Sequence, residues 1–338
     1  MVALIRDEPG LVLAGKYELL EKAGSGGMAV VWRARTLGAA GFTRPVAVKR
    51  IIPHLATNQE FVAMFVEESR VVSELAHPAI AQIHDFDADE NGHHFLVLEW
   101  IEGCDLQELV DAFVRDGQPT PWSVMGSIAI DVLEALAAAH ERRDATGRAA
   151  PIFHRDVTPH NVRLGALGYV KLTDFGIARA ADRATITRPD AIKGKLSYVA
   201  PEMLRAAPAS AQTDLFAVGV VLWESITGRR LYEAPSDMEV MFKVHEAKAE
   251  DLCAVRPDVP PALGAAVHRA LARDPAARPE SARAMAHELA LALRASAEPV
   301  EERRIAQLVS FAKGRTTVPA MPRIAAMPTT EIELEDAD

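Results

Sequence analysis

The sequence predicts an α+β fold in which a small antiparallel β region is followed by a larger, mainly helical region. In the first hundred residues, apolar and β-branched side chains alternate with polar ones between glycine-rich turns, as in an antiparallel sheet. After residue 106, apolar residues recur at helical spacing, with proline and glycine between the repeats. The 338 residues leave room for roughly two domain-sized units.

The β region is expected to contain strands within 17–31 and over 45–51, interrupted by one helix over 60–75. Phe61 and Phe65 lie one turn apart on one face of this helix, which a His-Pro pair ends. We therefore expect a single helix beside a sheet.

The helical region contains four apolar patterns of helical period, over 122–140, 215–226, 263–272 and 282–293. The longest apolar run, 215–223, lies between Asp214 and Glu224 and is far shorter than the ~18 residues of a membrane helix. It predicts a buried core helix.

The composition limits the classes of binding partner and the cellular compartment that we expect for this chain. The formal net charge of −10 repels phosphate backbones and anionic lipid, which argues against nucleic acid or a membrane as the principal partner. The two cysteines, Cys104 and Cys253, match neither a zinc site nor a disulfide framework. With no signal-peptide pattern at the start, we expect a cytoplasmic protein.

The two ends of the chain are expected to lie outside the folded region. Residues 1–16 precede the first clear strand and are interpreted as an N-terminal extension. From 296 to 338 the chain loses periodicity, gains prolines and ends in a run of acidic residues. We predict that this segment is a disordered acidic tail.

Two motifs in the β region are suited to phosphate. Glycines in the stretch 24–28 let backbone N–H groups close over phosphates without Cβ obstruction, although an ordinary glycine hairpin has the same pattern. Lys49 follows on a later strand, where a fixed ammonium would neutralise phosphate oxygens. Glu68, on the predicted helix, is placed to hold that ammonium by an ion pair.

Three motifs in the helical region carry acidic and amide groups. In the string 154–161, Asp156 would orient an attacking hydroxyl and Asn161 would offer an amide oxygen to a metal ion. Asp174 begins an Asp-Phe-Gly sequence at a strand end, where magnesium bridging two phosphates would need a carboxylate. An Ala-Pro-Glu sequence at 200–202 closes the polar segment that follows.

In this order, the motifs resemble those of the eukaryotic-like (Hanks-type) serine/threonine protein kinase family of bacterial type, over residues 17–295. The resemblance implies the two-lobed protein kinase fold, with an N-lobe over 17–101 and a C-lobe over 102–295. It implies transfer of the γ-phosphoryl group of ATP, with Mg²⁺, to serine or threonine hydroxyls on protein substrates.

The resemblance also implies residue roles. Asp156, Lys49 and Glu68 would be catalytic, and Asn161 and Asp174 would bind the metal. Leu98 would be the gatekeeper, and ATP would be bound by Gly24, Ser25, Gly26, Gly27, Met28, Val31, Ala47, Lys49, Glu99, Ile101 and Asp105. Structural roles are implied for Asp214, which would brace the catalytic loop, for a buried Arg278–Glu202 pair, and for an apolar stack of Val72, Ile83, His154 and Phe175.

Four positions depart from the family pattern. Thr158 stands where these kinases usually carry a lysine, and Lys195 stands where they usually carry a threonine. We hypothesise that Lys195 reaches back to supply the missing charge while Thr158 supplies the hydroxyl, the alternative being two independent losses. Arg163 replaces an apolar side chain under the adenine, where it would stack on the base or obstruct it, and Ala29 replaces the third loop glycine.

The sequence leaves alternatives for both the regulation and the function of the chain. Autophosphorylation, with self-association, is expected on Thr187 first and Thr185 second, with Arg155 binding the phosphate. Thr329 and Thr330 precede the acidic run and are a weaker docking candidate than a solvated charge run. A pseudokinase scaffold and a small-molecule phosphotransferase are the competing functions, and dual specificity remains open.

Overall fold

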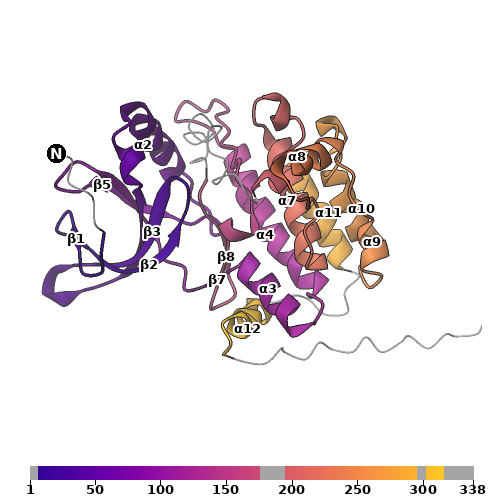
Figure 1. The fold of residues 1–338 in the computed structure, drawn as a ribbon, viewed down its shortest axis with the longest axis horizontal. Coiled ribbons are helices and arrows are strands. Elements are labelled where there is room, and N and C mark those ends of the chain that lie inside the picture. The colour runs from indigo at the N-terminus through magenta and orange to yellow at the C-terminus, as the bar shows by residue number, and fades with distance from the viewer. Residues whose placement is uncertain (1–6, 176–194, 295–301, 316–338) are drawn as a thin grey trace, which may run out of the picture.

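A six-stranded antiparallel sheet forms the first lobe of the computed structural model, which describes residues 7–175, 195–294 and 302–315 (Figure 1). Its strand order is β1-β2-β3-β4-β6-β5. The strands are β1 (Val12–Leu13), β2 (Tyr17–Ser25), β3 (Ala29–Thr36), β4 (Pro45–Ile51), β5 (Ile83–Ala88) and β6 (His94–Glu99). Helices α1 (Pro53–Ala56) and α2 (Gln59–Ser73) follow β4, so the expected helix over 60–75 is confirmed within two residues at each end.

The alternation of β4 explains the two faces of this sheet. Val46 and Val48 point into an apolar cluster with Trp32 of β3. Ala47, between them, points to the opposite face, where it packs with Phe65 of α2. Asn58 caps α2 by accepting a hydrogen bond from the Phe61 backbone N–H at 3.1 Å. The sheet thus carries Lys49 of β4 on the face that bears α2.

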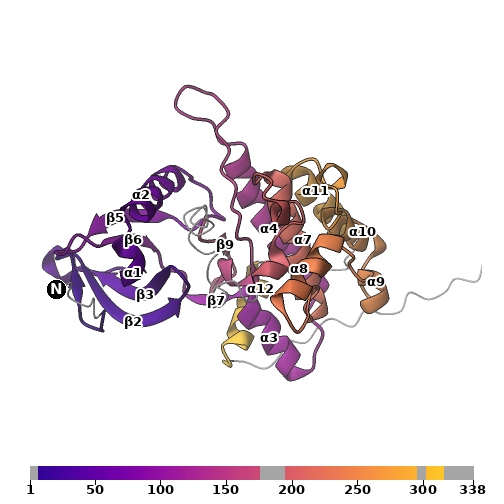
Figure 2. The same cartoon turned by 45° about the horizontal axis from the view of Figure 1, so that its top comes forward.

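Helices and a small sheet form the second lobe. The three-stranded sheet has the order β7-β8-β9 and lies at the boundary between the lobes (Figure 2). Its strands are β7 (Gly103–Asp105), β8 (Val162–Gly165) and β9 (Val170–Leu172). The helices are α3 (Leu106–Asp116), α4 (Trp122–His140), α7 (Ala211–Thr227), α8 (Asp237–Glu246), α9 (Leu252–Val255), α10 (Pro261–Ala270), α11 (Ala282–Leu293) and α12 (Glu302–Ala312). Short 3-10 turns are η1 (Ala39–Gly41), η2 (Pro159–Asn161), η3 (Leu196–Tyr198), η4 (Met203–Arg205) and η5 (Pro275–Ala277). The small antiparallel β lobe and the larger helical lobe confirm the predicted fold class.

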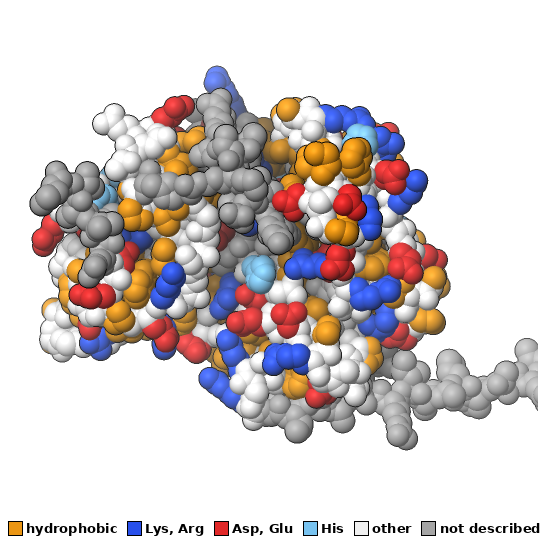
Figure 3. Space-filling model, viewed as in Figure 1, with side chains coloured by type: hydrophobic (Ala, Val, Ile, Leu, Met, Phe, Trp, Pro, Cys, Tyr) orange, Lys and Arg blue, Asp and Glu red, His pale blue; other side chains and the backbone are white. Residues whose placement is uncertain are grey.

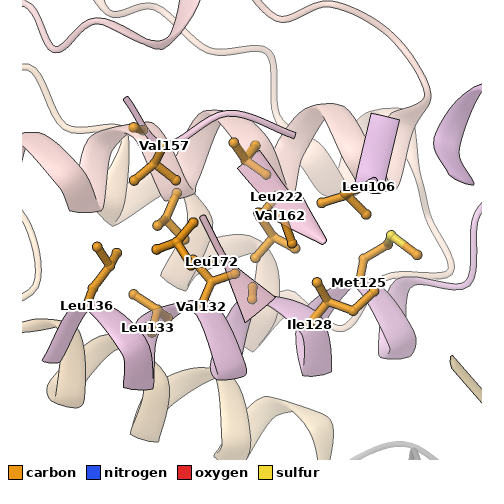
Figure 4. Close-up of a cluster of buried hydrophobic side chains, with 14 of the residues drawn as sticks. Leu106, Met125, Ile128, Val132, Leu133, Leu136, Val157, Val162, Leu172 and Leu222 are labelled. Carbon is orange, nitrogen blue, oxygen red and sulfur yellow. The ribbon is translucent and has the colours of Figure 1, made fainter. Parts of the chain in front are cut away.

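The core of the helical lobe supports the segment that carries the site. Helix α4 directs one apolar face toward Val157, Val162 and Leu172, and Leu222 of α7 closes the cluster (Figure 4). Val157 follows Asp156, and Val162 follows Asn161. Burial of these side chains therefore fixes the backbone on which the polar site residues stand. Helix α4 is long and apolar enough to cross a bilayer, but most of it is buried inside this lobe.

The C-terminal expectation was wrong in part. Residues 302–312, which we predicted to be disordered, form helix α12, which packs on α3, β7 and β8 (Figures 1 and 2). Ile305, Leu308 and Val309 are buried in the lobe's core. The helix forms because these side chains share one face, which makes their burial on a neighbouring surface favourable. Residues 316–338, including Thr329 and Thr330, lie outside the described residues.

The N-terminal extension is also partly folded. Strand β1 pairs antiparallel with β2, and Leu13 is buried in the sheet's core. Arg50 of β4 is buried and pairs with Asp7 and with Asp89, which ties the start of the described chain to the lobe. The folded unit therefore begins before residue 17 and includes Asp7, the first described residue.

Candidate active site

The loop that carries Asp156 is held in place by the buried carboxylate of Asp214. Asp214 of α7, 1% exposed, accepts hydrogen bonds from the backbone N–H groups of His154 and Arg155, both at 2.8 Å. His140 of α4 contacts the same carboxylate at 2.8 Å through Nε2. Arg155 has a positive φ of 66°, a strained conformation that these bonds stabilise. The bracing role expected for Asp214 is confirmed by these contacts.

Asp156 and Asn161 form one hydrogen-bonded unit. The Asn161 side-chain N–H₂ donates to the backbone oxygen of Asp156 at 2.7 Å and to its Oδ2 at 3.0 Å. Turn η2 brings the two residues together, and its Pro159 presets the first turn. Because the amide nitrogen is used in this way, the Asn161 side-chain oxygen faces away from Asp156. The pair thus offers a carboxylate for a hydroxyl proton beside an amide oxygen for a cation.

Lys195 lies directly against the Asp156 carboxylate. Its Nζ donates to Asp156 Oδ2 at 2.7 Å, across 39 residues of sequence. Burial would raise the pKa of Asp174, but the ammonium of Lys49, with smaller contributions from His154 and Lys195, lowers it below its ordinary value. Lys195 therefore acts on both carboxylates of the site. Thr158 is buried two residues after Asp156, and its hydroxyl forms no hydrogen bond to the other site residues in the described part of the chain.

Lys49 has a different partner from the one expected. Its Nζ donates to Asp174 Oδ1 at 2.7 Å, and among the described residues no ion pair joins it to Glu68. The expected Lys49–Glu68 pair is therefore absent from this conformation, because Lys49 turns toward the boundary between the lobes rather than toward α2. The partner of an ammonium on a flexible stem depends on where α2 lies relative to the sheet, which spacing along the chain does not determine.

The glycine-rich stretch forms the turn between β2 and β3. The Gly26 N–H donates to the Ala29 backbone oxygen at 2.9 Å, and the Met28 oxygen accepts from Ile52 at 2.9 Å. A Cβ built on Gly24 meets no heavy atom within 4 Å, so one side of this hairpin is open. Gly27, Ser25 and Val31 lie on the same hairpin. This arrangement leaves room for a ligand against the backbone.

The segment that joins the lobes carries three further expected residues. Leu98 is buried against the face of the sheet that carries α2. Glu99 ends β6, and its side chain accepts from Lys171 at 2.7 Å. Ile101 follows it, and no backbone hydrogen bond is formed by Ile101 within the described ranges. Its backbone groups are therefore available to the edge of a planar ring.

Asp105 is engaged by the protein itself. Its Oδ1 caps α3 by accepting from the Glu108 N–H at 2.8 Å. Its Oδ2 lies 3.4 Å from His160 Nδ1 and 3.7 Å from Arg163 Nη1. The hydrogen bond to Asp105 raises the pKa of His160 above its ordinary value, although partial burial opposes this. Arg163 is thus held at the β7–β8 edge by the carboxylate that was expected to bind a ribose.

The donor set suits magnesium. Asn161 Oδ1 and the second oxygen of Asp174 are hard oxygen donors, which Mg²⁺ prefers, and it usually keeps several waters and phosphate oxygens as its other ligands. The residues that were expected to bind the metal therefore fit that ion. Among the described residues, no group of three His, Cys, Asp or Glu side chains forms a metal cage by itself.

The expected structural residues are assembled as predicted. Phe175 and His154 are buried with ring centroids 4.6 Å apart, and both belong to the lobe's interior with Val72 and Ile83 against it. His154 Nε2 is 2.8 Å from the Thr173 backbone oxygen and its Nδ1 accepts from the Asp156 N–H at 3.3 Å, so the protein itself engages both ring nitrogens. In a separate pair, two guanidinium nitrogens of Arg278 donate to Glu202 at 2.7 Å. Residues 176–194, with Thr185 and Thr187, lie outside the described residues.

Sequence reasoning missed Arg230, which lies next to the same segment as Lys195. Its guanidinium bonds to Tyr198 and, at 3.1 Å, to buried Glu224. The signal was a pair of arginines directly after the core helix α7, where Gly228 ends the helix with a φ of 68°.

The known proteins that this chain resembles are protein kinases. Residues 17–290 match the family described as "Protein kinase domain". Tyrosine-protein kinase MasK of Myxococcus xanthus is 37% identical over 275 residues, covering 81% of this chain and 42% of the relative. Serine/threonine-protein kinase PrkC of Bacillus subtilis is 32% identical over 295 residues, covering 87% of this chain and 43% of the relative. The crystal structure of the Mycobacterium tuberculosis PknI kinase domain matches with a TM-score of 0.63 and 27% identity, covering 85% of this chain and 100% of that chain. The chain thus spans less than half the length of these two curated relatives.

Proposed function

The chain belongs to the protein kinase family, and on that premise we propose that it transfers the γ-phosphoryl group of Mg-ATP to serine or threonine hydroxyls on proteins. One observation carries the proposal. Asp156, Asn161, Asp174, Lys49 and Lys195 come from segments up to 146 residues apart (195 − 49) and meet in two adjacent groups. Lys49 pairs with Asp174, Asn161 and Lys195 bond to Asp156, and the charge of Lys195 also acts on Asp174. Such a set suits positioning and charge stabilisation, which are most of what phosphoryl transfer requires.

The roles follow from where each group points. Asp156 would accept the proton of the substrate hydroxyl while the hydroxyl oxygen bonds to the γ-phosphorus. The bond between the γ-phosphorus and the β–γ bridging oxygen breaks at the same time, and ADP leaves. Asn161 and Asp174 would hold magnesium, which neutralises charge on the phosphates when bound. Lys49, on the sheet, would hold the nucleotide phosphates, and the backbone of the 24–28 turn would cover them.

Lys195 supplies the positive charge that Thr158 does not. Its ammonium is already 2.7 Å from Asp156, so it can interact with a γ-phosphoryl group that approaches the acceptor. A lysine on the segment after residue 194 thus performs the task that these kinases usually assign to a lysine two residues after the catalytic aspartate. The contact between Lys195 and Asp156 supports the exchange over two independent losses.

Activation requires a change of partner at Lys49. In this conformation Lys49 holds Asp174, one of the proposed metal ligands. Binding of a magnesium nucleotide would compete for Asp174 and release Lys49 toward Glu68 of α2. Phosphorylation of Thr187, or of Thr185, would add an anion that Arg155 can bind, since Arg155 Nε is buried without a hydrogen-bond partner among the described residues.

The alternative is a scaffold that binds nucleotide but transfers phosphate poorly. The ion pair of Arg163 with Asp105 favours it, because both residues lie where the nucleotide's ring and sugar are expected. The complete set of Lys49, Asp156, Asn161 and Asp174 favours catalysis instead.

The test is incorporation of label from γ-phosphate-labelled ATP with magnesium. Wild-type protein and Asp156→Asn would be incubated with and without a generic protein acceptor, and modified residues would be mapped by mass spectrometry. We expect label on serine or threonine that disappears in Asp156→Asn. Label on tyrosine alone, the residue named for MasK, would contradict the serine/threonine assignment. Nucleotide binding without any label would support the scaffold.

A further inference from the structure

Two cations near the 154–161 loop each pair with a less exposed carboxylate: Lys195 bonds to Asp156, and Arg230, whose charge acts on His160, pairs with Glu224. Lys195 is 54% exposed, whereas its partner Asp156 is 18% exposed. Arg230 is 38% exposed, whereas its partner Glu224 is 6% exposed. In each pair the cation covers the carboxylate, so the positive group is the one that an approaching chain meets first.

Arg230 is fixed in this orientation by a closed set of contacts. Glu224 accepts from the Leu231 backbone N–H at 3.0 Å through Oε1, and from Tyr198 OH at 2.7 Å and Arg230 Nη1 at 3.1 Å through Oε2. The guanidinium also lies over the Tyr198 ring, 5.8 Å from its centroid. The buried carboxylate is therefore satisfied by the chain's own donors, and a substrate cation would have to displace Arg230 to reach it.

One short segment links Arg230 to Lys195. Lys195 precedes η3, and Tyr198 is the last residue of that turn. Ser197, between them, donates to the Tyr232 backbone oxygen at 3.0 Å, which attaches η3 to the stretch that carries Arg230. Both cations therefore lie beside η3, Lys195 directly before it and Arg230 bonded to its last residue, Tyr198. Figure 3 shows positively charged and histidine side chains beside carboxylates on the face between the lobes.

Arg230 keeps donors for a ligand. Its Nη1 serves Tyr198 and Glu224, while its Nε and Nη2 have no partner in the part of the chain that the structure describes. A guanidinium with free donors suits a carboxylate better than an ammonium does, because its planar fork fixes direction as well as charge.

We propose that Arg230, together with Lys195, makes the kinase select acceptor hydroxyls that have a carboxylate side chain within a few residues. This inference rests on the proposed protein kinase function and names its substrate class. The net charge of −10 does not oppose it, because charges farther away than about 8 Å are largely screened at physiological ionic strength. Local cations at the acceptor site therefore outweigh the distant acidic surface.

The chain itself provides a suitable probe. Residues 324–334 contain Thr329 and Thr330 followed by Glu331 and Glu333, the only carboxylate side chains of that stretch. A peptide of this sequence would be compared with one in which Glu331 and Glu333 are replaced by Gln, and with a third in which both are replaced by Lys. We expect KM to be about tenfold lower for the acidic peptide than for the Gln peptide, with similar kcat.

Two enzyme variants locate the effect. Arg230→Gln should reduce the ratio of the two KM values to about twofold or less, mainly through the acidic peptide. Arg229→Gln is the matched control, because the neighbouring Arg229 pairs with Glu250 at 3.1 Å and lies over Trp223 instead. It should leave the ratio unchanged. Raising NaCl from about 50 to 300 mM should raise KM for the acidic peptide and not for the Gln peptide.

The outcomes separate this inference from the function on which it rests. Equal KM values for the acidic and Gln peptides in the wild type, or a preference for the Lys peptide, would overturn the inference while leaving the kinase activity established. If Arg230→Gln weakened phosphorylation of the acidic and Gln peptides equally, Arg230 would have a structural role only. If that variant does not fold, the peptide and salt series on the wild type decide the question. No label in any peptide or in the protein would refute the proposed function itself.

Discussion

Reciprocal exchange of Thr158 and Lys195 tests the most unusual feature of the site. Lys195→Thr removes the ammonium that lies 2.7 Å from Asp156, and adding Thr158→Lys returns a lysine to the position where these kinases usually have one. If the two positions share one function, the double variant should be more active than Lys195→Thr alone.

The expected rate loss in Lys195→Thr depends on how far the Lys195 side chain is exposed to solvent. Two unit charges about 4 Å apart interact by about 1 kcal/mol in water and about 4 kcal/mol near a protein surface. Lys195 is about half exposed, so we take an intermediate value of about 2 kcal/mol, which corresponds to about 30-fold in rate. Because this charge acts on the transferring phosphoryl group, the loss should appear in kcat and leave KM for ATP within about twofold.

The assay is steady-state phosphorylation of a generic substrate by wild type, both single variants and the double variant. The expected coupling energy between the two positions is about 2 kcal/mol, because the double variant recovers most of kcat. Lys16→Thr is the matched control: it is 57% exposed, pairs with Asp87 at 2.9 Å, and lies in the other lobe. The reasoning is refuted if Lys195→Thr retains kcat within about threefold, if kcat and ATP affinity fall together, or if the two substitutions are simply additive.

Three further predictions concern regions around the site. Arg163→Leu should lower KM for ATP by about threefold to tenfold, because it frees Asp105 and restores an apolar surface under the ring; an unchanged or raised KM would show that the guanidinium helps to bind the nucleotide. Leu308→Ala, at a fully buried position of α12, should cost about 2–4 kcal/mol in the free energy of unfolding, measured by denaturant titration, and a loss below about 1 kcal/mol would contradict tight docking of α12. Burial, with the charges of Glu302 and a second glutamate, raises the pKa of Asp131 to about 6, so the folded state binds this proton more tightly than the unfolded state and stability falls as pH rises from about 4 to 6. Asp131→Asn should therefore stabilise the protein by about 1–2 kcal/mol at pH 8, the ceiling of about 3 kcal/mol being reduced by partial exposure, and by less at pH 5; equal melting shifts at both pH values would contradict this.

Prediction from the sequence was most accurate where the residue types and their spacing along the chain determine the structure locally. The catalytic string at 154–161 needs its residue types at fixed spacing, and the structure brings Asp156 and Asn161 into contact as that spacing implied. Helix 122–140 was located to the residue, because a long amphipathic pattern between a proline and a polar turn has few alternatives.

Helix α12 was missed although its signal was present. Ile305, Leu308, Val309 and Ala312 are spaced as one helical face, but the segment lies between proline-containing, aperiodic stretches. An isolated helix of 11 residues is marginal in water, so its formation depends on a docking surface. That surface includes Phe113, whose ring centroid is 5.1 Å from that of Phe311, and Gly168, where a Cβ would lie 1.9 Å from the Glu302 oxygen. Neither contact can be inferred from the helix's own sequence.

The partner of Lys49 was beyond sequence reasoning for a related reason, and it explains how the site can be switched. In this conformation Lys49 pairs with Asp174 and Glu68 is also engaged, so moving Lys49 to Glu68 exchanges existing contacts for others rather than adding an ion pair. To change a 1:99 population into 99:1, the stabilising contacts must together differ by about 5.5 kcal/mol between the two states. A phosphothreonine on the segment before Lys195 would form one to three charge-assisted hydrogen bonds with Arg155, each contributing about 1.5–3 kcal/mol. One such modification, added to the competition of a magnesium nucleotide for Asp174, is therefore of the right size to move the site from the arrangement seen here to one in which Lys49 pairs with α2.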